Sequence, residues 1–220
     1  MPRRPALSHD RIIDAAVQVA DRGGLAQVSM RNVGKELGVE AMSLYHHLAG
    51  KDALLDALAN WIFTRIELPE PRQPWRQAMA DRAASARATL SEHPWALGLI
   101  ESRRSPGPAL LRHHDTVLGC LRGNGFPMTL AAHAFSAIDA YVYGFVLTEL
   151  NLPFDVDSAA EEIVGEIGEQ LSPDLYPHLA ELVAEQVMHR DYAYGDEFEY
   201  GLALILDSLE SRLASDDPSD

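Results

Sequence analysis

Residues 29–51 read S-M-R-N-V-G-K-E-L-G-V-E-A-M-S-L-Y-H-H-L-A-G-K, and this stretch predicts two short helices joined by a tight bend. Ser29 is positioned to cap the first helix by accepting a backbone N–H bond. Val33 and Leu37 lie one turn apart, so they share the buried face of that helix. Gly38 follows directly, where helices often end in a left-handed residue that glycine adopts at low cost.

The second helix of the pair is expected over residues 40–48, with Leu44 and Leu48 facing inward. The side chains between these leucines are an unusual mixture for a plain exposed surface. Two helices around a short glycine-containing turn form a helix-turn-helix, whose second helix enters the DNA major groove. A simple helical hairpin shows the same spacing, so the spacing alone leaves both interpretations open.

Residues 37–58, L-G-V-E-A-M-S-L-Y-H-H-L-A-G-K-D-A-L-L-D-A-L, closely resemble the recognition region of the TetR (tetracycline repressor) family of bacterial transcription regulators. An aromatic residue and a lysine occupy the family positions that Tyr45 and Lys51 hold here. The resemblance is strong over residues 8–65 and rests on helical character and layout beyond them. It implies a repressor that binds palindromic operator DNA as a homodimer and is released by a small-molecule effector. The family's DNA-facing positions carry Arg31, Ala41, Met42, Ser43, Tyr45, His46, His47 and Lys51.

These DNA-facing residues are expected to divide their roles. Arg31 is the candidate for a bidentate guanine contact. Ser43, Tyr45 and Lys51 are expected to hold phosphates and fix the register. The front of the recognition helix offers only apolar contact, so we expect specificity to rest on Arg31 and the flanking histidines.

The charge of the chain is divided unevenly between its two ends. The formal net charge is −15, from 18 Lys and Arg against 33 Asp and Glu. Residues 1–65 hold 8 basic and 7 acidic side chains, whereas residues 66–220 hold 10 and 26. Because an acidic body repels phosphate, we expect the body to face away from DNA.

Helical periodicity and turn residues predict an all-α protein. The family resemblance implies an N-terminal three-helix helix-turn-helix domain and a C-terminal helical ligand-binding and dimerisation domain. The prolines between residues 69 and 74 form a stiff break. We assign residues 1–50 to the DNA-binding domain, 51–68 to a linking helix and 69–220 to the body. Helices are expected at residues 8–22, 29–37, 40–48, 51–67, 74–91, 94–104, 108–123, 127–150, 158–171 and 196–214, with another beginning at Ser172-Pro173.

The helices expected at 127–150 and 196–214 are apolar on enough of their surface to be buried on several sides. The apolar faces of these two helices either fill the core of one monomer or pair with a second copy of the chain, and the sequence pattern does not distinguish these two arrangements. The family resemblance implies a four-helix dimer interface, and a two-fold dimer is what reads a palindrome. The predicted interface residues are Ile138, Tyr141, Val142, Phe145, Leu202, Ile205, Leu206 and Leu209.

Asp139 stands in an otherwise apolar helix, and a buried carboxylate needs partners. It either faces a pocket with a polar or cationic ligand or hydrogen-bonds a neighbouring helix. The residues predicted to line an effector pocket are Trp75, Met79, Trp95, Phe135, Asp139 and Tyr143. Glu67 stands where the tetracycline repressors have a ligand histidine, so a tetracycline–magnesium effector is doubtful.

The sequence shows no spacing typical of a metal site or a catalytic centre. The adjacent pairs His46-His47 and His113-His114 point about 100° apart on a helix, so neither pair chelates one ion. There is no His-Glu-x-x-His, nucleophile elbow, phosphate loop or Gly-x-Gly-x-x-Gly. We therefore expect no metal, no cofactor and no enzyme activity. The alternative is an all-helical small-molecule-binding protein or enzyme whose N-terminal hairpin is only structural.

Cys120 is the one cysteine of the chain, which fits a reducing cytoplasm. Its apolar surroundings predict a buried small hydrophobe rather than a reactive thiol. The chain has no run of 18 uninterrupted apolar residues and no apolar leader segment, so we expect a cytoplasmic protein without a membrane span. The sequence identifies neither the effector nor the operator.

Overall fold

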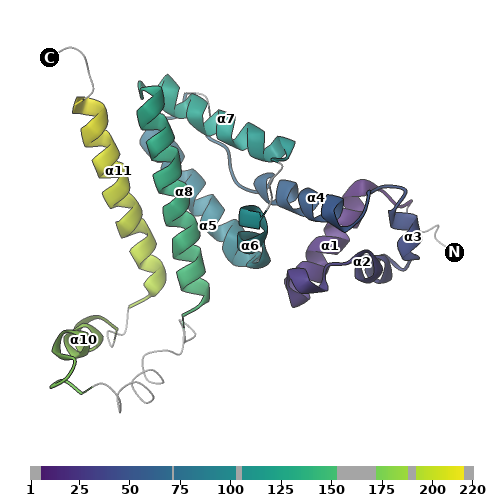
Figure 1. Ribbon diagram of the computed structural model, residues 1–220. Helices are drawn as coiled ribbons and strands as arrows, with labels where there is room; N and C mark the ends of the chain where they lie inside the picture. The colour runs from purple at the N-terminus through teal and green to yellow at the C-terminus, as the bar shows by residue number, and fades with distance from the viewer. Residues whose placement is uncertain (1–5, 71, 103–105, 153–171, 188–191, 216–220) are drawn as a thin grey trace.

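The computed structural model describes residues 6–70, 72–102, 106–152, 172–187 and 192–215, and every regular element in these ranges is a helix (Figure 1). The N-terminal group holds α1 (His9–Gly23), a 3-10 turn (Leu25–Gln27), α2 (Met30–Leu37) and α3 (Ala41–Leu44). The helix α4 (Lys51–Phe63) leads from this group to the body. The body contains α5 (Trp75–Glu92), α6 (Trp95–Ser102), α7 (Pro108–Gly123), α8 (Met128–Leu150), α10 (Pro177–Leu182) and α11 (Glu197–Ser215). The helix predicted at 158–171 lies outside the described residues.

The N-terminal group is built around α1, which packs against both α2 and α4. Ser8 caps α1 by accepting a bond from the backbone N–H of Arg11 (3.4 Å). Ile12, Ala16 and Val17 of its predicted apolar stripe are buried. Burying that stripe against two other helices is what holds the small group together, because isolated helices of this length are marginal in water.

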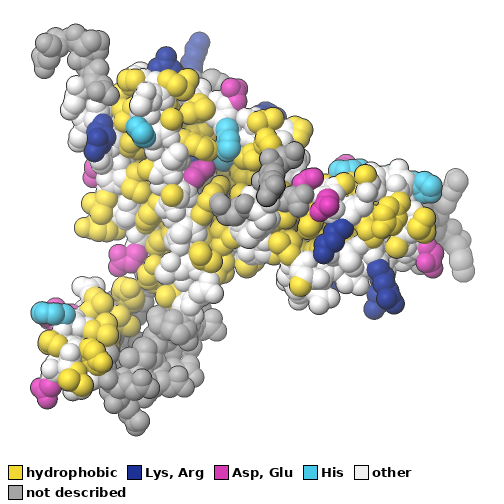
Figure 2. Space-filling model, in the orientation of Figure 1, with side chains coloured by type: hydrophobic (Ala, Val, Ile, Leu, Met, Phe, Trp, Pro, Cys, Tyr) yellow, Lys and Arg dark blue, Asp and Glu magenta, His cyan; other side chains and the backbone are white. Residues whose placement is uncertain are grey.

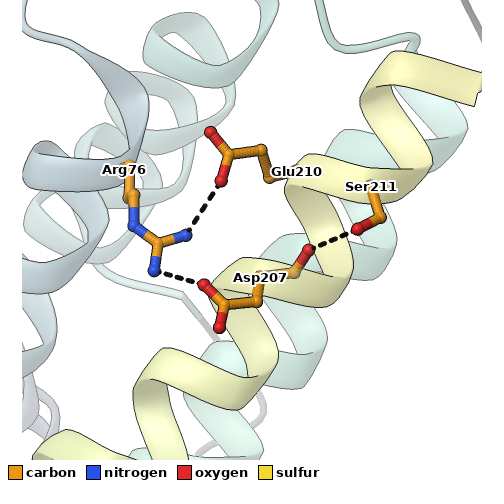
Figure 3. A network of polar contacts seen from close by, with 4 residues as sticks. All are labelled: Arg76, Asp207, Glu210 and Ser211. Atoms are coloured by element: carbon orange, nitrogen blue, oxygen red, sulfur yellow. Dashed lines mark hydrogen bonds and ion pairs between the residues drawn. The ribbon is translucent and has the colours of Figure 1, made fainter.

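The body is arranged around α5, which packs against α6, α7 and α8, while α8 also contacts α7 and α11. On the exposed side, Arg76 of α5 forms ion pairs with Asp207 (2.5 Å) and Glu210 (3.4 Å) of α11 (Figure 3). Deeper in, Arg87 of α5 pairs with Glu149 of α8. The Arg76 bridges join α11 to α5 and the Arg87 bridge joins α8 to α5, and Figure 1 shows α8 and α11 running side by side.

Most predicted helices are found within a residue or two of their expected ends, but three expectations on helix bounds are wrong. Regular α-helix in the second helix of the motif stops at Leu44, because the N–H groups of Tyr45 and His47 bond to carbonyls three residues earlier. The linking helix ends at Phe63 rather than 67, where Thr64 and Arg65 close the last turn in the same tightened way.

The third wrong expectation is a helix starting at Ser172-Pro173. Residues 173–175 instead form a turn, in which the N–H groups of Leu175 and Tyr176 both donate to the Ser172 carbonyl. A helix starting at Pro173 would require an N–H at Pro177, which proline lacks. The helix therefore begins at Pro177, where a missing N–H costs nothing.

Among the described residues, α8 is long and apolar enough to cross a membrane by length and composition, with a mean hydropathy of 1.4 over 18 residues. The core helix of a globular protein passes the same test, and α8 contacts α5, α7 and α11. Leu130, Ile138, Val142 and Val146 are buried in those contacts. The apolar character of α8 is thus used for packing in the body.

Candidate DNA-binding surface and effector site

The first helix of the helix-turn-helix, α2, is capped at its start and ends at a left-handed glycine. Ser29 accepts a hydrogen bond from the backbone N–H of Asn32 (3.2 Å), as the sequence predicts. Gly38 has φ 67° and ψ 35°, so the predicted left-handed turn is also confirmed. Val33 is buried and Leu37 is half-buried, which places the predicted face against the core.

Gly34 is a residue of this motif that sequence reasoning missed. It is buried on α2, and a Cβ built there would lie 3.0 Å from the Val39 carbonyl oxygen and 3.3 Å from the Ala41 nitrogen. The absence of a side chain therefore lets the start of α3 approach the backbone of α2. Its place one residue after Val33, on the inner side of a short helix, is the signal that could have identified it.

The eight predicted DNA-facing residues lie on one small part of the chain, and none of them is buried. Leu44 and Leu48 anchor the segment with exposed fractions of 0% and 7%, whereas Met42 is 72% and Tyr45 49% exposed. The two histidines, Arg31 and Lys51 are exposed, and Ala41 and Ser43 are half-buried. Figure 2 shows dark-blue Lys and Arg and cyan His side chains on the end of the molecule that holds α1–α3. This end can therefore offer cations, ring nitrogens and apolar groups to another molecule.

The helix α4 connects this end to the interior of the body. Lys51 is its first residue, and the ring of Phe63, its last residue, lies 5.4 Å from the ring of His113 on α7. A helix of this length spans roughly 18 Å between those two residues. Asn60 adds a second attachment, because its side-chain oxygen accepts a bond from the Ala109 N–H (2.8 Å).

A second connection, the junction cluster, consists of Asp21 on α1, His93 after α5 and Trp95 on α6. One carboxylate oxygen of Asp21 accepts bonds from Trp95 Nε1 (2.6 Å) and His93 Nδ1 (2.8 Å). His93 also meets the ring of Trp61 on α4 edge-on, with centroids 5.1 Å apart. The junction cluster thus ties α1, the first helix of the N-terminal group, to the body.

The interior of the body contains a polar cluster formed by Arg82 of α5, His113 of α7 and Asp139 of α8. The Arg82 side chain is 2% exposed and forms an ion pair with Asp139 through Nη2. Arg82 Nε donates to His113 Nε2 (3.1 Å). Asp139 therefore hydrogen-bonds a neighbouring helix, which is the second of the two roles that the sequence left open. We call these three residues the central cluster.

Two donors of the central cluster have no hydrogen-bond partner among the described residues. They are Arg82 Nη1 and His113 Nδ1, and both atoms are buried. Burial, with the charge of Arg82 and the neighbouring His114, lowers the pKa of His113 to about 3, so it is neutral at pH 7. Burial also lowers the pKa of Arg82, to about 10, which still leaves it charged. Leaving a buried donor without a partner costs free energy, so each of these donors is suited to donate a hydrogen bond to an oxygen of a bound molecule.

The predicted pocket residues divide between this cluster and other parts of the body. Phe135 and Tyr143 lie near Arg82: the guanidinium carbon is 5.7 Å from the Phe135 ring centre, and Tyr143 interacts with it electrostatically. Met79 is buried in the core, and Trp75 packs on Phe126 instead. Trp95 belongs to the junction cluster. Arg82, on the buried face three residues after Met79, is the residue that sequence reasoning missed.

Most of the predicted dimer residues lie in the core of one protomer. Six of the eight are at most 7% exposed within one protomer, whereas Tyr141 and Ile205 are partly accessible. The part of these eight residues in a dimer interface stays a prediction. The apolar residues that these two helices do expose differ from the eight predicted ones. The sequence pattern does not show which side of an apolar helix is covered by its own protomer. The exposed residues include Met128, Leu147, Leu150, Tyr200 and Leu204.

The surface of the body has two hollows beside α5. One, of about 1150 Å³, is an open groove between α5 and α11, and its guanidinium groups, on Arg76 and Arg87, are already paired with carboxylates. The other, of about 410 Å³, has Arg82 in its wall and Glu67, Glu70 and Asp81 around it. The wall of this second hollow includes Arg82, the residue whose Nη1 has no hydrogen-bond partner among the described residues.

The described residues contain no group of three or more His, Cys, Asp or Glu side chains placed to hold a metal ion. Cys120 is buried, and burial raises its pKa. Its side chain lies in the hydrophobic core, as the sequence predicts.

Two family descriptions match almost the whole chain. "Bacterial regulatory proteins, tetR family" matches residues 12–58. "Tetracyclin repressor-like, C-terminal domain" matches residues 68–213. The first match covers the helix-turn-helix, and the second covers the body with its central cluster.

Relatives and solved structures show the same likeness over the full length. The chain is 33% identical to the HTH-type transcriptional repressor DrrR1 of Streptomyces coeruleorubidus, over 96% of this chain and 80% of that protein. Tetracycline repressor protein class D of Escherichia coli is 26% identical, over 95% and 92%. Apo ActR from Streptomyces coelicolor superposes with a TM-score of 0.78 at 25% identity, over 97% and 99%. ActR in complex with actinorhodin gives a TM-score of 0.75 at 26% identity, over 95% and 99%.

Proposed function

Since the chain belongs to the TetR family of bacterial transcriptional regulators, we propose that it represses transcription by binding a palindromic operator as a homodimer, from which an effector bound in the body releases it. It is a ligand-responsive regulator, like relatives whose structures hold small molecules. The proposal places it in the cytoplasm and gives it no catalytic role. Residues 1–50, 51–68 and 69–220 serve as DNA-binding domain, linking helix and body.

The observation that carries the DNA-binding proposal is the exposed set of side chains above Leu44 and Leu48. A recognition segment needs buried anchors on one side and free side chains on the other, and this segment has both. Arg31 is exposed on the first turn of α2, where it is proposed to read guanine. Lys51 stands exposed at the first position of α4, where a phosphate would also meet the helix N-terminus.

The test is fluorescence anisotropy with a labelled fragment from the region upstream of the protein's own coding sequence. Arg31→Ala should weaken binding by about 1–3 kcal/mol. Arg112→Ala, which removes an exposed arginine from α7 in the body, is the matched control and should leave binding unchanged. If Arg31→Ala binds as tightly as the parent at every salt concentration, the groove assignment is wrong.

The proposed release step runs through α4. A ligand at the central cluster would press on His113, which contacts Phe63 at one end of α4, while Lys51 lies at the other end. A shift of α4 changes the spacing of two recognition segments in a dimer, which then no longer match successive major grooves. The effector must bind the released form more tightly than the DNA-bound form for this to happen.

The proposed dimer face is the outer side of α8 and α11. Tyr200 and Leu204 are one turn apart on α11 and more than half exposed, and Leu147 is similarly exposed on α8. Figure 2 shows apolar side chains gathered over these helices. The small exposed residues Ala140 and Gly144 on α8 would let a second copy approach closely.

Sedimentation velocity tests this face with two leucines of equal exposure. Leu204→Glu on α11 should convert the dimer to monomer, because it would bury a charge in the interface. Leu111→Glu on α7 is the control and should stay dimeric, since Leu111 is 54% exposed and Leu204 55%. A dimeric Leu204→Glu variant would exclude this face.

A further inference from the structure

The first turn of α7 is capped by a side chain that comes from another helix. Gly107 holds the N-cap position of α7 and has no side chain that could accept a hydrogen bond. The backbone N–H of Ala109, two residues later, instead donates to the side-chain oxygen of Asn60 on α4 (2.8 Å). An N-cap side chain usually accepts from this same position, so Asn60 supplies from the linking helix the cap that Gly107 lacks.

The close contact between Asn60 and Gly107 depends on the absence of a side chain at Gly107. A Cβ built there would lie 2.7 Å from the side-chain oxygen of Asn60 and 3.1 Å from its Cβ. Gly107 has φ −74° and ψ 166°, an extended conformation that any residue adopts, so its backbone does not require glycine. The space that Asn60 occupies therefore explains the glycine at this position.

The packing around this bond leaves room for α4 to move. A hollow of about 90 Å³ lies beside Asn60, between α4, α6 and α7. Phe63, one turn further along α4, meets His113 of α7 ring to ring. Apolar contacts do not depend on direction, whereas a hydrogen bond does. The bond from Ala109 to Asn60 is therefore suited to fix the position of α4 on α7.

We propose that Asn60 is a positioning residue, which holds the linking helix in one place on the body by capping α7. This inference rests on the function proposed above and adds the contact through which the body sets the position of the DNA-binding end. The helix α7 also carries His113 of the central cluster, so a movement of α7 would displace α4 through the same bond. Without the bond, α4 can shift into the space beside it, and the DNA-binding end moves with α4.

The test measures the distance between the two parts within one chain. Nitroxide labels are attached to Lys35→Cys on α2 and Ala84→Cys on α5, both at exposed positions, in a Cys120→Ala background. Labelled chains are diluted into an excess of unlabelled parent, and double electron–electron resonance gives the distribution of distances between the two labels. This distribution should be narrow in the parent.

Two substitutions of Asn60 give opposite expectations. Asn60→Ala should broaden the distribution of label distances. Asn60→Asp keeps an acceptor oxygen at the N-terminus of α7, where a negative charge is also favourable, and should retain the narrow distribution. The proposal is overturned if Asn60→Ala gives the same distribution as the parent.

Moving the cap separates positioning from stability. Asn60→Ala should raise the unfolding equilibrium constant about fivefold, the usual effect of a lost N-cap. The double variant Asn60→Ala/Gly107→Ser places a cap directly before α7, and the 3.1 Å contact between the two Cβ atoms requires only a small shift. It should recover stability but keep the broadened distances. If it recovers both, Asn60 is only a cap and the proposal is overturned. If the double variant does not fold, Asn60→Ala and Asn60→Asp still decide the outcome.

The control for a lost cap is Ser8→Ala. Ser8 caps α1 from the residue directly before that helix, so its loss should also destabilise the chain but leave the label distances unchanged. A distribution that broadens in Ser8→Ala as it does in Asn60→Ala would mean that lower stability alone moves the two parts, and would overturn the proposal.

Operator binding is measured in the same chains without labels. Asn60→Ala should weaken it by about two- to thirtyfold, because the two recognition segments of a dimer are no longer held at one spacing. Broadened distances with an unchanged operator affinity would overturn the role of Asn60 in DNA binding. A parent that binds no operator DNA would refute the proposed function, and the distances would still decide whether Asn60 positions α4.

Discussion

The DNA-binding end and the central cluster of the body are built in opposite ways. At the DNA-binding end, Leu44 and Leu48 are buried and the polar side chains of Tyr45, His46 and His47 between them are exposed, all within one short stretch. In the central cluster Arg82 and His113 are buried and Asp139 is half-buried, and Arg82 meets partners 31 and 57 residues further along the chain. The DNA-binding end thus exposes its polar groups to solvent, as binding to a large charged partner such as DNA requires. The central cluster instead holds its polar groups inside the body.

This difference determines what a mutation should do in each region. Exposed side chains at the DNA-binding end are expected to affect DNA binding and to have little effect on folding, because water solvates them when DNA is absent. The central cluster is expected to stabilise the fold, since removing one member leaves buried charge or dipoles unpaired. The junction cluster lies between the two regions and should affect both folding and the response to effector.

The largest expected effect is on stability, from Arg82→Ala. Removing the guanidinium leaves Asp139 and His113 without their partner, and breaking a buried pair costs about 3–5 kcal/mol. The control is Arg76→Ala on the same helix, whose ion pairs are solvent-exposed and contribute about 0–1 kcal/mol. Urea denaturation of both variants tests the contrast. Equal losses of unfolding free energy in the two variants would show that burial does not determine how much an ion pair contributes to stability.

The next effect in size is acid destabilisation through His113. Its pKa is about 3 in the folded chain and about 6.5 when unfolded, so between these values the unfolded state binds the extra proton. The stability that neutral His113 contributes to the folded chain is fully present above pH 6.5 and is lost as the pH falls from 6.5 towards 3. Lowering the pH from 7.5 to 5 should cost about 2 kcal/mol of unfolding free energy through this group.

Urea denaturation at the two pH values measures this loss in the parent and in two variants. His113→Gln should reduce the pH dependence by that amount, whereas His47→Gln, at an exposed position of the DNA-binding end, should leave it unchanged. A pH dependence that survives in His113→Gln would mean that other groups cause it.

A smaller effect on stability is expected from Asp21→Ala in the junction cluster. The change leaves Trp95 Nε1 and His93 Nδ1 without their acceptor and should cost about 1–2 kcal/mol. With one connection between α1 and the body lost, an effector should also release less of the operator. Anisotropy with and without effector measures that response. An unchanged response would leave α4 as the sole route between the regions.

The local features of the N-terminal end were predictable because neighbouring residues determine them. A serine cap at Ser29, a left-handed turn at Gly38 and leucines one helical turn apart are short-range effects. The proline and glycine breaks placed most body helices for the same reason. The close approach at Gly34 was not predicted, because it depends on where the next helix lies.

The sequence by itself determined an all-helical chain, a helix-turn-helix at its N-terminal end and an acidic body behind it. Only the tertiary structure decided that Arg82, His113 and Asp139 meet, that Trp95 belongs to the junction cluster, and that most of the predicted dimer residues are buried within one protomer. Helical periodicity shows that a side chain faces inward, but not which helix it meets there. That choice is made when the helices pack, through contacts between residues far apart in the chain.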